Sequence, residues 1–148
     1  MKQRIRIIDS RYVIVALIVI CLFSPIIAMA ENDLPNIVLT GLNEYKAKGP
    51  EAAVKALIKG SAFETSIEAM SQANTFRQVE TMYGAYTGYQ VIKIKEISKT
   101  SKLVYLSMDY EKGPLFASFL SYKSGDKWLL ASFTFNMKPE VILPNNFF

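Results

Sequence analysis

The spacing of apolar positions along the chain changes once, near residue 89. Before that point, apolar side chains recur every three or four positions, which is typical of helices packed by one face. After it, runs rich in β-branched and aromatic residues alternate with short turn signals, which is typical of strands. The order therefore predicts an α+β domain with its helices first and its sheet second.

Three helices are predicted before the change. The first lies within "ENDLPNIVLTGLNEYKAKG", with Asp33 as its cap and Pro35 in its first turn. Gly49 ends it, and "PEAAVKALIKG" forms the second. The third lies within residues 61–84, with Ser61 or Thr65 as the candidate cap.

Four strands are predicted after the change: residues 89–98, 102–111, 114–123 and 127–137. The connections "KTSK", "KGP" and "SGDK" are short, which favours an antiparallel meander. The apolar tail "KPEVILPNNFF" contains two prolines, so we expect it to be irregular and packed along an edge.

The turns also predict which strand residues share a face. Tight turns at 112–113, 125–126 and 100–101 place Asp109 opposite Phe116, Phe135 opposite Phe116, and Ile94 opposite Ser107. One face then carries Ile92, Ile94, Tyr105, Ser107, Asp109, Phe116, Ser118, Leu120, Tyr122, Ala131, Phe133 and Phe135. The other carries Val91, Val104, Leu106, Met108, Tyr110, Leu115, Ala117, Phe119, Leu130 and Thr134.

Neither of these faces is polar, whereas a solvated sheet face should alternate cleanly. The helices can cover only one of them. The other needs the tail, a second protomer or a partner protein as its cover. We expect a homodimer through the sheet.

The first 30 residues have the features of a secretory signal peptide. A basic start precedes the apolar run "YVIVALIVICLF", and "AMA" ends at Ala30 with the small residues of a cleavage site. The prediction is cleavage after Ala30, a single mature domain of residues 31–148, and a periplasmic or secreted protein. The alternative is an uncleaved membrane anchor over residues 12–30, since about 20 residues can cross a bilayer.

The residue composition excludes several classes of catalytic and binding site. The chain has no histidine, which excludes a Ser-His-Asp triad, and its one cysteine, Cys21, lies in the signal segment. Residues 31–148 hold 13 basic and 12 acidic groups, so a nucleic-acid surface is not indicated. No nucleotide, calcium or other metal motif is present, and we expect neither a metal nor a cofactor.

The stretches "YGAYTGYQVI", "YEKGPLFASFLSYK" and "FTFNMKPEVILP" resemble small exported bacterial proteins of the cystatin-like, nuclear-transport-factor-like superfamily. The resemblance covers roughly residues 34–144. It implies a curved four-stranded sheet packed on helices as a cone, with a cavity between the two layers. It implies no particular catalytic motif, because that fold hosts enzymes and binding modules alike.

Asp109 is the one candidate for catalysis. A carboxylate among apolar walls has a raised pKa and acts as a base, and Tyr83, Tyr86 or Tyr105 can supply a hydroxyl. The competing interpretation is a solvated acid beside a turn. The phenylalanines of the sheet are predicted as core or interface, and otherwise as ligand-lining. The full set of candidate ligand-binding residues is Tyr83, Tyr86, Tyr89, Tyr105, Asp109, Phe116 and Phe135.

The sequence therefore favours an exported, non-enzymatic binding module for a small apolar ligand or an envelope protein. Its membrane contact would be limited to the N-terminal segment. One alternative is a membrane-anchored accessory protein of an envelope complex. Another is a proton-shuttling isomerase or lyase that uses Asp109 with a tyrosine.

Overall fold

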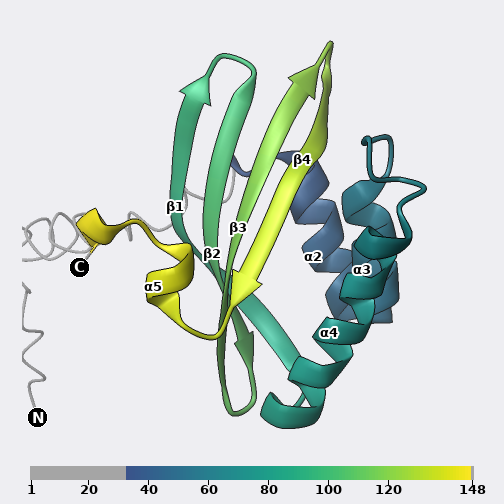
Figure 1. Cartoon of the computed structure of the whole chain (residues 1–148), viewed down its shortest axis with the longest axis vertical. Coiled ribbons are helices and arrows are strands. Elements are labelled where there is room, and N and C mark those ends of the chain that lie inside the picture. The colour runs from purple at the N-terminus through teal and green to yellow at the C-terminus, as the bar shows by residue number, and fades with distance from the viewer. Residues whose placement is uncertain (1–32, 148) are drawn as a thin grey trace, which may run out of the picture.

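A computed structural model describes residues 33–147 and shows an α+β fold. Three helices cover one face of a four-stranded antiparallel sheet, and a short C-terminal segment lies on the other side (Figure 1). The strand order β1-β2-β3-β4 confirms the predicted meander. The predicted signal segment, residues 1–30, lies outside the described residues.

The helices are α2 (Asn36–Lys48), α3 (Pro50–Ile58) and α4 (Ile67–Tyr83). Gly49 separates the first two with φ 86°, a left-handed backbone angle that favours glycine. Gly41 lets α2 and α3 approach closely, because a side chain there would clash with Leu57. No helix within residues 33–147 is both long and apolar enough to cross a membrane.

Two predicted helix caps are wrong. Pro35 precedes α2 without a side-chain cap, and Asp33 instead pairs with the ammonium of Lys102 on the sheet. α4 begins after Ser66, whose Oγ accepts a hydrogen bond from the Ala69 amide at 3.1 Å. Ser61 lies too far before α4 to cap it, and its hydroxyl donates to the Ile58 carbonyl, 2.6 Å away, at the end of α3.

The strands are β1 (Tyr86–Ser98), β2 (Ser101–Tyr110), β3 (Gly113–Ser124) and β4 (Lys127–Asn136). They match the predicted runs and extend several of them. The β2–β3 turn is Glu111–Lys112, so Asp109 pairs with Pro114 and not with Phe116. This shift of two residues keeps every side chain on its predicted face, because the period of a strand is two.

Register irregularities overturn four face predictions, three in β4 and one in β1. Between β3 and β4 the register shifts at Leu120/Ser121, and Phe133 and Phe135 then oppose Phe119 and Ala117 on the helix side. Beyond the same shift Thr134 opposes Ser118, on the side away from the helices.

The register of β1 also shifts, between Val91 and Lys93. Ile94 therefore opposes Val104 on the helix side, and not Ser107 as the predicted turn at 100–101 implied. An extra residue in one strand reverses the alternation of all that follow, which is the common physical reason for these corrections.

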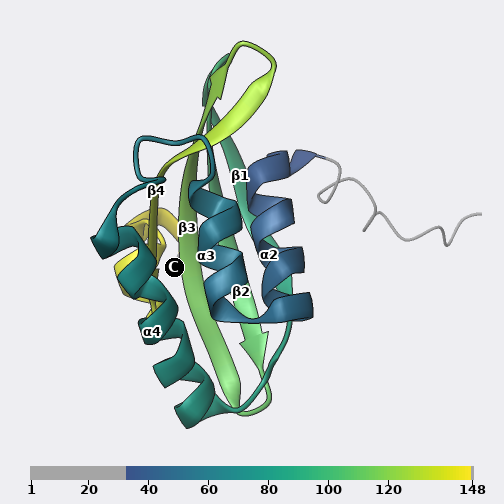
Figure 2. The ribbon, with the colours of Figure 1, turned by 90° about the vertical axis from the view of Figure 1, so that its right-hand side faces the viewer.

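The inner face of the sheet and the three helices enclose the main core (Figure 2). Phe76 of α4 and Phe119 of β3 are its largest fully buried side chains. Val104, Leu106, Met108 and Tyr110 of β2 all point into it, in the alternation expected of a covered face.

The outer face has a smaller cover. The C-terminal segment forms α5 (Pro139–Ile142) and the 3-10 helix η3 (Asn145–Phe147), and so is partly helical where we expected an irregular tail. Ile142 and Leu143 pack with Tyr105 into a second, separate apolar cluster. The tail is therefore one cover of this face, and a second protomer stays a prediction.

Candidate functional site

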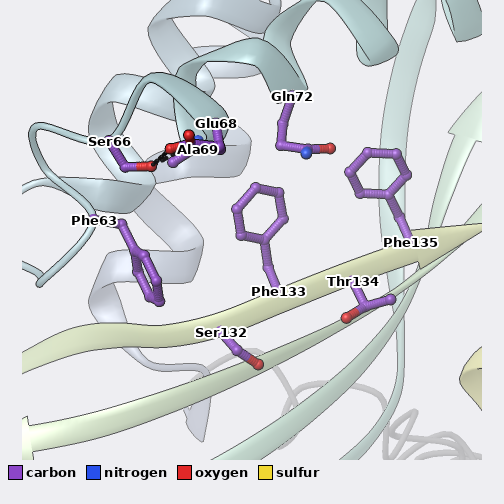
Figure 3. A pocket seen from close by; sticks show the side chains of 9 residues that line it. All are labelled: Phe63, Ser66, Glu68, Ala69, Gln72, Ser132, Phe133, Thr134 and Phe135. Atoms are coloured by element: carbon purple, nitrogen blue, oxygen red, sulfur yellow. Dashed lines mark hydrogen bonds between the residues drawn. The ribbon is translucent and has the colours of Figure 1, made fainter.

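A pocket of about 500 Å³ lies between the N-terminal half of α4 and strand β4 (Figure 3). The pocket therefore lies between the helix layer and the sheet. Nine residues line it: Phe63, Ser66, Glu68, Ala69, Gln72, Ser132, Phe133, Thr134 and Phe135. Ser132 and Thr134 belong to this lining as part of β4, and their side chains point away from the three aromatic rings.

The aromatic wall of the pocket is held by the core behind it. Phe135 stacks on Phe76 with ring centroids 4.6 Å apart, and Phe133 stacks on Phe119 at 6.3 Å. Phe133 and Phe135 also lie 6.1 Å apart. The irregular register of β4 turns both rings towards α4, so the wall exists because the alternation of the strand is broken.

The opposite wall is polar and comes from the first turns of α4. The Ser66 hydroxyl donates to Glu68 Oε2 at 2.9 Å while it also caps the helix. The backbone amide of Glu68 and this hydroxyl hold the pKa of the Glu68 carboxyl below its usual range. Glu68 is therefore a stable, exposed anion at the pocket mouth.

Gln72 is the polar group directed between the rings. Figure 3 shows its side chain extending from α4 towards the space between Phe133 and Phe135. Its amide makes no hydrogen bond to another residue of the described chain. An amide in this position can donate to one ligand atom and accept from another.

The sheet divides the predicted ligand-binding residues between two sides. Tyr105, Asp109 and Phe116 lie on the outer face, whereas Phe135 lies on the helix side and is the only one that lines the pocket.

The other three predicted residues are tyrosines that pack against the main core. Tyr83, Tyr86 and Tyr89 lie where α4 meets β1. The Tyr83 ring fits against Gly113, at which any side chain would collide with it.

Asp109 has its own hydrogen-bonding partners on the outer face. Gln90 Nε2 donates to Asp109 Oδ2 at 2.9 Å, and Ser107 Oγ donates to Oδ1 at 2.9 Å. The hypothesis of proton transfer requires a tyrosine within hydrogen-bonding reach. These two hydrogen bonds hold the Asp109 carboxylate in place beside the β2–β3 turn, and its role as a base with a tyrosine stays a prediction.

A buried tyrosine cluster was missed by the sequence analysis. The Tyr45 and Tyr110 hydroxyls are 3.0 Å apart, and the Tyr86 ring stacks on Tyr45 at 4.4 Å. The Tyr86 hydroxyl is buried and has no hydrogen-bonding partner among residues 33–147. Only the helical spacing of Tyr45 signalled its burial, and nothing local signalled which rings it meets.

Burial dominates the electrostatics of this cluster. Desolvation, opposed by the hydrogen bond from Tyr45, raises the pKa of Tyr110 to about 12. Desolvation, with the hydroxyl and charge of Tyr110, also raises the pKa of Tyr45. Desolvation and the nearby Tyr110 raise that of Tyr86. All three hydroxyls are therefore protonated and neutral at physiological pH.

A metal centre has no support in the part of the chain that the structure describes. Within it, no three Asp, Glu, His or Cys side chains gather closely enough to hold a metal ion.

Comparison with models of known protein families, with curated proteins and with solved structures finds no match to this chain.

Proposed function

We propose that the protein is an exported, non-enzymatic binding module that holds a small apolar ligand in the α4–β4 pocket. One observation carries the proposal: an aromatic wall of Phe63, Phe133 and Phe135 faces the Gln72 amide, which has no partner within the described chain. Its volume of about 500 Å³ falls within the range of sites for small molecules.

The walls define the ligand class. Three phenylalanine rings favour a flat or compact apolar body, since aromatic pairs contribute beyond their buried area. Gln72 favours one hydrogen-bonding group on that body. Glu68, an exposed anion at the mouth, disfavours a negatively charged ligand. The ligand proposed is a neutral, mainly apolar molecule with a single polar group.

The pocket lining supports binding more than catalysis. Glu68 is the only one of the nine lining residues with an acid or base group of ordinary titration range. Its carboxylate is already engaged by the Ser66 hydroxyl and lies at the mouth, away from the aromatic wall. A general base directed at the bound molecule is therefore missing from this lining.

The test uses the neutral fluorescent probe N-phenyl-1-naphthylamine. Gln72→Phe fills the pocket, and we expect it to weaken probe binding at least tenfold. Gln78→Phe is the matched control, because Gln78 is an exposed glutamine on the same helix. Equal probe binding by both variants and the unsubstituted protein would overturn the proposal.

Native mass spectrometry of the protein recovered from its native envelope tests the exported state and the ligand together. The expected species begins at Glu31 and carries extra non-covalent mass, and the same spectrum reports any homodimer. An uncleaved chain that only detergent extracts would instead support the membrane-anchored accessory protein.

A further inference from the structure

A second hollow lies on the helix side, between α2, α3 and the start of β4. Its volume is about 770 Å³, and none of its lining residues belongs to the α4–β4 pocket. α2 and α3 lie side by side in front of the sheet (Figure 2), and both helices contact β4. The apolar part of the lining is Ile37, Ala52, Ala56, Trp128 and Leu129. We refer to this hollow as the lysine groove.

Positive charge surrounds the apolar lining. Lys48, Lys55, Lys59 and Lys127 line the groove, against the carboxylates of Glu44 and Asp126. This balance differs from that of the α4–β4 pocket, whose one charged lining residue is Glu68.

Two of the four lysines already have carboxylate partners. Lys48 pairs with Glu44 at 2.8 Å, and Lys55 pairs with Glu51 at 3.0 Å, both one helical turn apart and exposed. Lys59 and Lys127 form no ion pair with any residue in 33–147. These two ammonium groups are therefore available to an external anion.

Trp128 adds an aromatic surface that the fold keeps in place. It is half-buried, and the Lys102 ammonium lies 5.7 Å from the centre of its ring. Lys102 is itself held by Asp33 just before α2, so this end of the groove is tied to both the sheet and the helices. The Trp128 indole thus lies between the apolar lining of the groove and the lysine ammonium groups.

We propose that the lysine groove binds a single-chain anionic amphiphile, a molecule with one carboxylate-like head and an apolar tail. Lys59 and Lys127 receive the head, and the tail lies along Ile37, Ala56 and Trp128. The chemistry is complementary at both ends, since the lysines attract the anion and the apolar lining shields the tail from water. This site goes beyond the proposed function, which concerns a neutral ligand in a different pocket.

Trp128 is the only tryptophan of the chain, so its fluorescence reports on this groove. The experiment titrates the protein with decanoate below its micelle concentration, and in parallel with decanol as the uncharged analogue. We expect a saturable change in Trp128 emission with decanoate and a weaker one with decanol. No saturable change with decanoate, or an equal affinity for decanol, would overturn the proposal.

The variant Lys59→Gln/Lys127→Gln removes the two unpaired cations. Because exposed charge pairs are individually weak, we expect decanoate affinity to fall about three- to tenfold, with decanol unaffected. Lys95→Gln/Lys99→Gln is the matched control, since it removes the same charge from exposed positions of the first hairpin. Equal losses in both variants indicate general attraction to a cationic protein and contradict a defined head site.

A third variant tests how much the apolar lining contributes to decanoate binding, apart from the lysines. Ala56→Phe fills the groove without changing its charge, and we expect it to weaken decanoate and decanol alike by at least tenfold. Probe binding in the α4–β4 pocket should be unchanged in this variant. Decanoate binding that survives Ala56→Phe would place the amphiphile elsewhere and overturn the assignment.

Discussion

The two faces of the sheet are built from the same four strands and yet differ in what covers them. The inner face packs under three helices, and its β2 residues Val104, Leu106 and Met108 are at most 1% exposed. The outer face is covered in part by the C-terminal segment, through a small cluster around Tyr105. Towards the β2–β3 turn it carries the polar group of Asp109, Gln90 and Ser107. The difference shows that apolar alternation alone does not reveal how deeply a face is buried.

The sharpest test of this contrast uses two leucines of one strand. Leu106→Ala removes a fully buried side chain from the inner face and should lower the free energy of unfolding by about 2 to 5 kcal/mol. Leu103→Ala on the outer face should cost about 1 kcal/mol, because that side chain keeps part of its contact with water. Chemical denaturation measures both, and equal losses would contradict the contrast.

The buried tyrosines of the inner face should make the free energy of unfolding fall at alkaline pH. The folded-state pKa of Tyr110 is about 12, above its ordinary value of 10. Above pH 10 the unfolded chain loses this proton and the folded chain keeps it, so stability falls as pH rises from about 10 to 12. The expected slope is about 1.4 kcal/mol per pH unit for each such tyrosine.

Urea denaturation at pH 8 to 11.5 measures this slope. Tyr110→Phe should remove its own share of about 1.4 kcal/mol per pH unit and leave the shares of Tyr45 and Tyr86, whose pKa values are also raised. Tyr122→Phe should leave the slope unchanged, because Tyr122 is 48% exposed. An unchanged slope in Tyr110→Phe would exclude Tyr110 as its source.

The C-terminal cover predicts a smaller effect. Ile142→Ala should destabilise the domain by about 1 to 2 kcal/mol, since the side chain is 8% exposed but its cluster is small. The neighbouring Val141 is 57% exposed and makes a matched control, so Val141→Ala should change little. Thermal unfolding compares the two, and equal effects would mean that α5 does not protect the outer face.

The smallest expected effect concerns Asp109. Asp109→Asn should change the free energy of unfolding by less than about 1 kcal/mol, because both hydrogen bonds lie at a partly solvated surface. It should leave probe binding in the α4–β4 pocket unchanged, since the sheet stands between the two. A loss of probe binding at constant stability would return Asp109 to the candidate site.

The fold was largely predictable because its signals are local. Gly49, Pro50 and Gly84 mark helix boundaries through backbone angles that neighbouring residues scarcely alter. The short turns before β2, β3 and β4 leave antiparallel pairing as the simple connection. The cap of α2 failed as a prediction because Pro35, which has no capping group, occupies the N-cap position. The cap of α4 failed because several polar residues near its start were equally suitable.

The candidate site was much less predictable. Of the seven candidate ligand-binding residues, only Phe135 lines the α4–β4 pocket, and it was predicted on the wrong face. Phe63 and Gln72 carried no signal that separates a pocket wall from a core or surface position. The grouping of Lys59, Lys127 and Trp128 joins segments almost 70 residues apart, which no local pattern reports.

The sequence by itself determined the order of elements, the antiparallel meander and the lack of histidine chemistry, because these depend on residue type and short-range spacing. The tertiary structure decided on which face of the sheet each side chain of β1 and β4 lies. One irregular position reverses the alternation for the rest of a strand, and its place is set by how strands twist against each other and against the helices. The positions of Phe133 and Phe135, and therefore the pocket, follow from that single change of register.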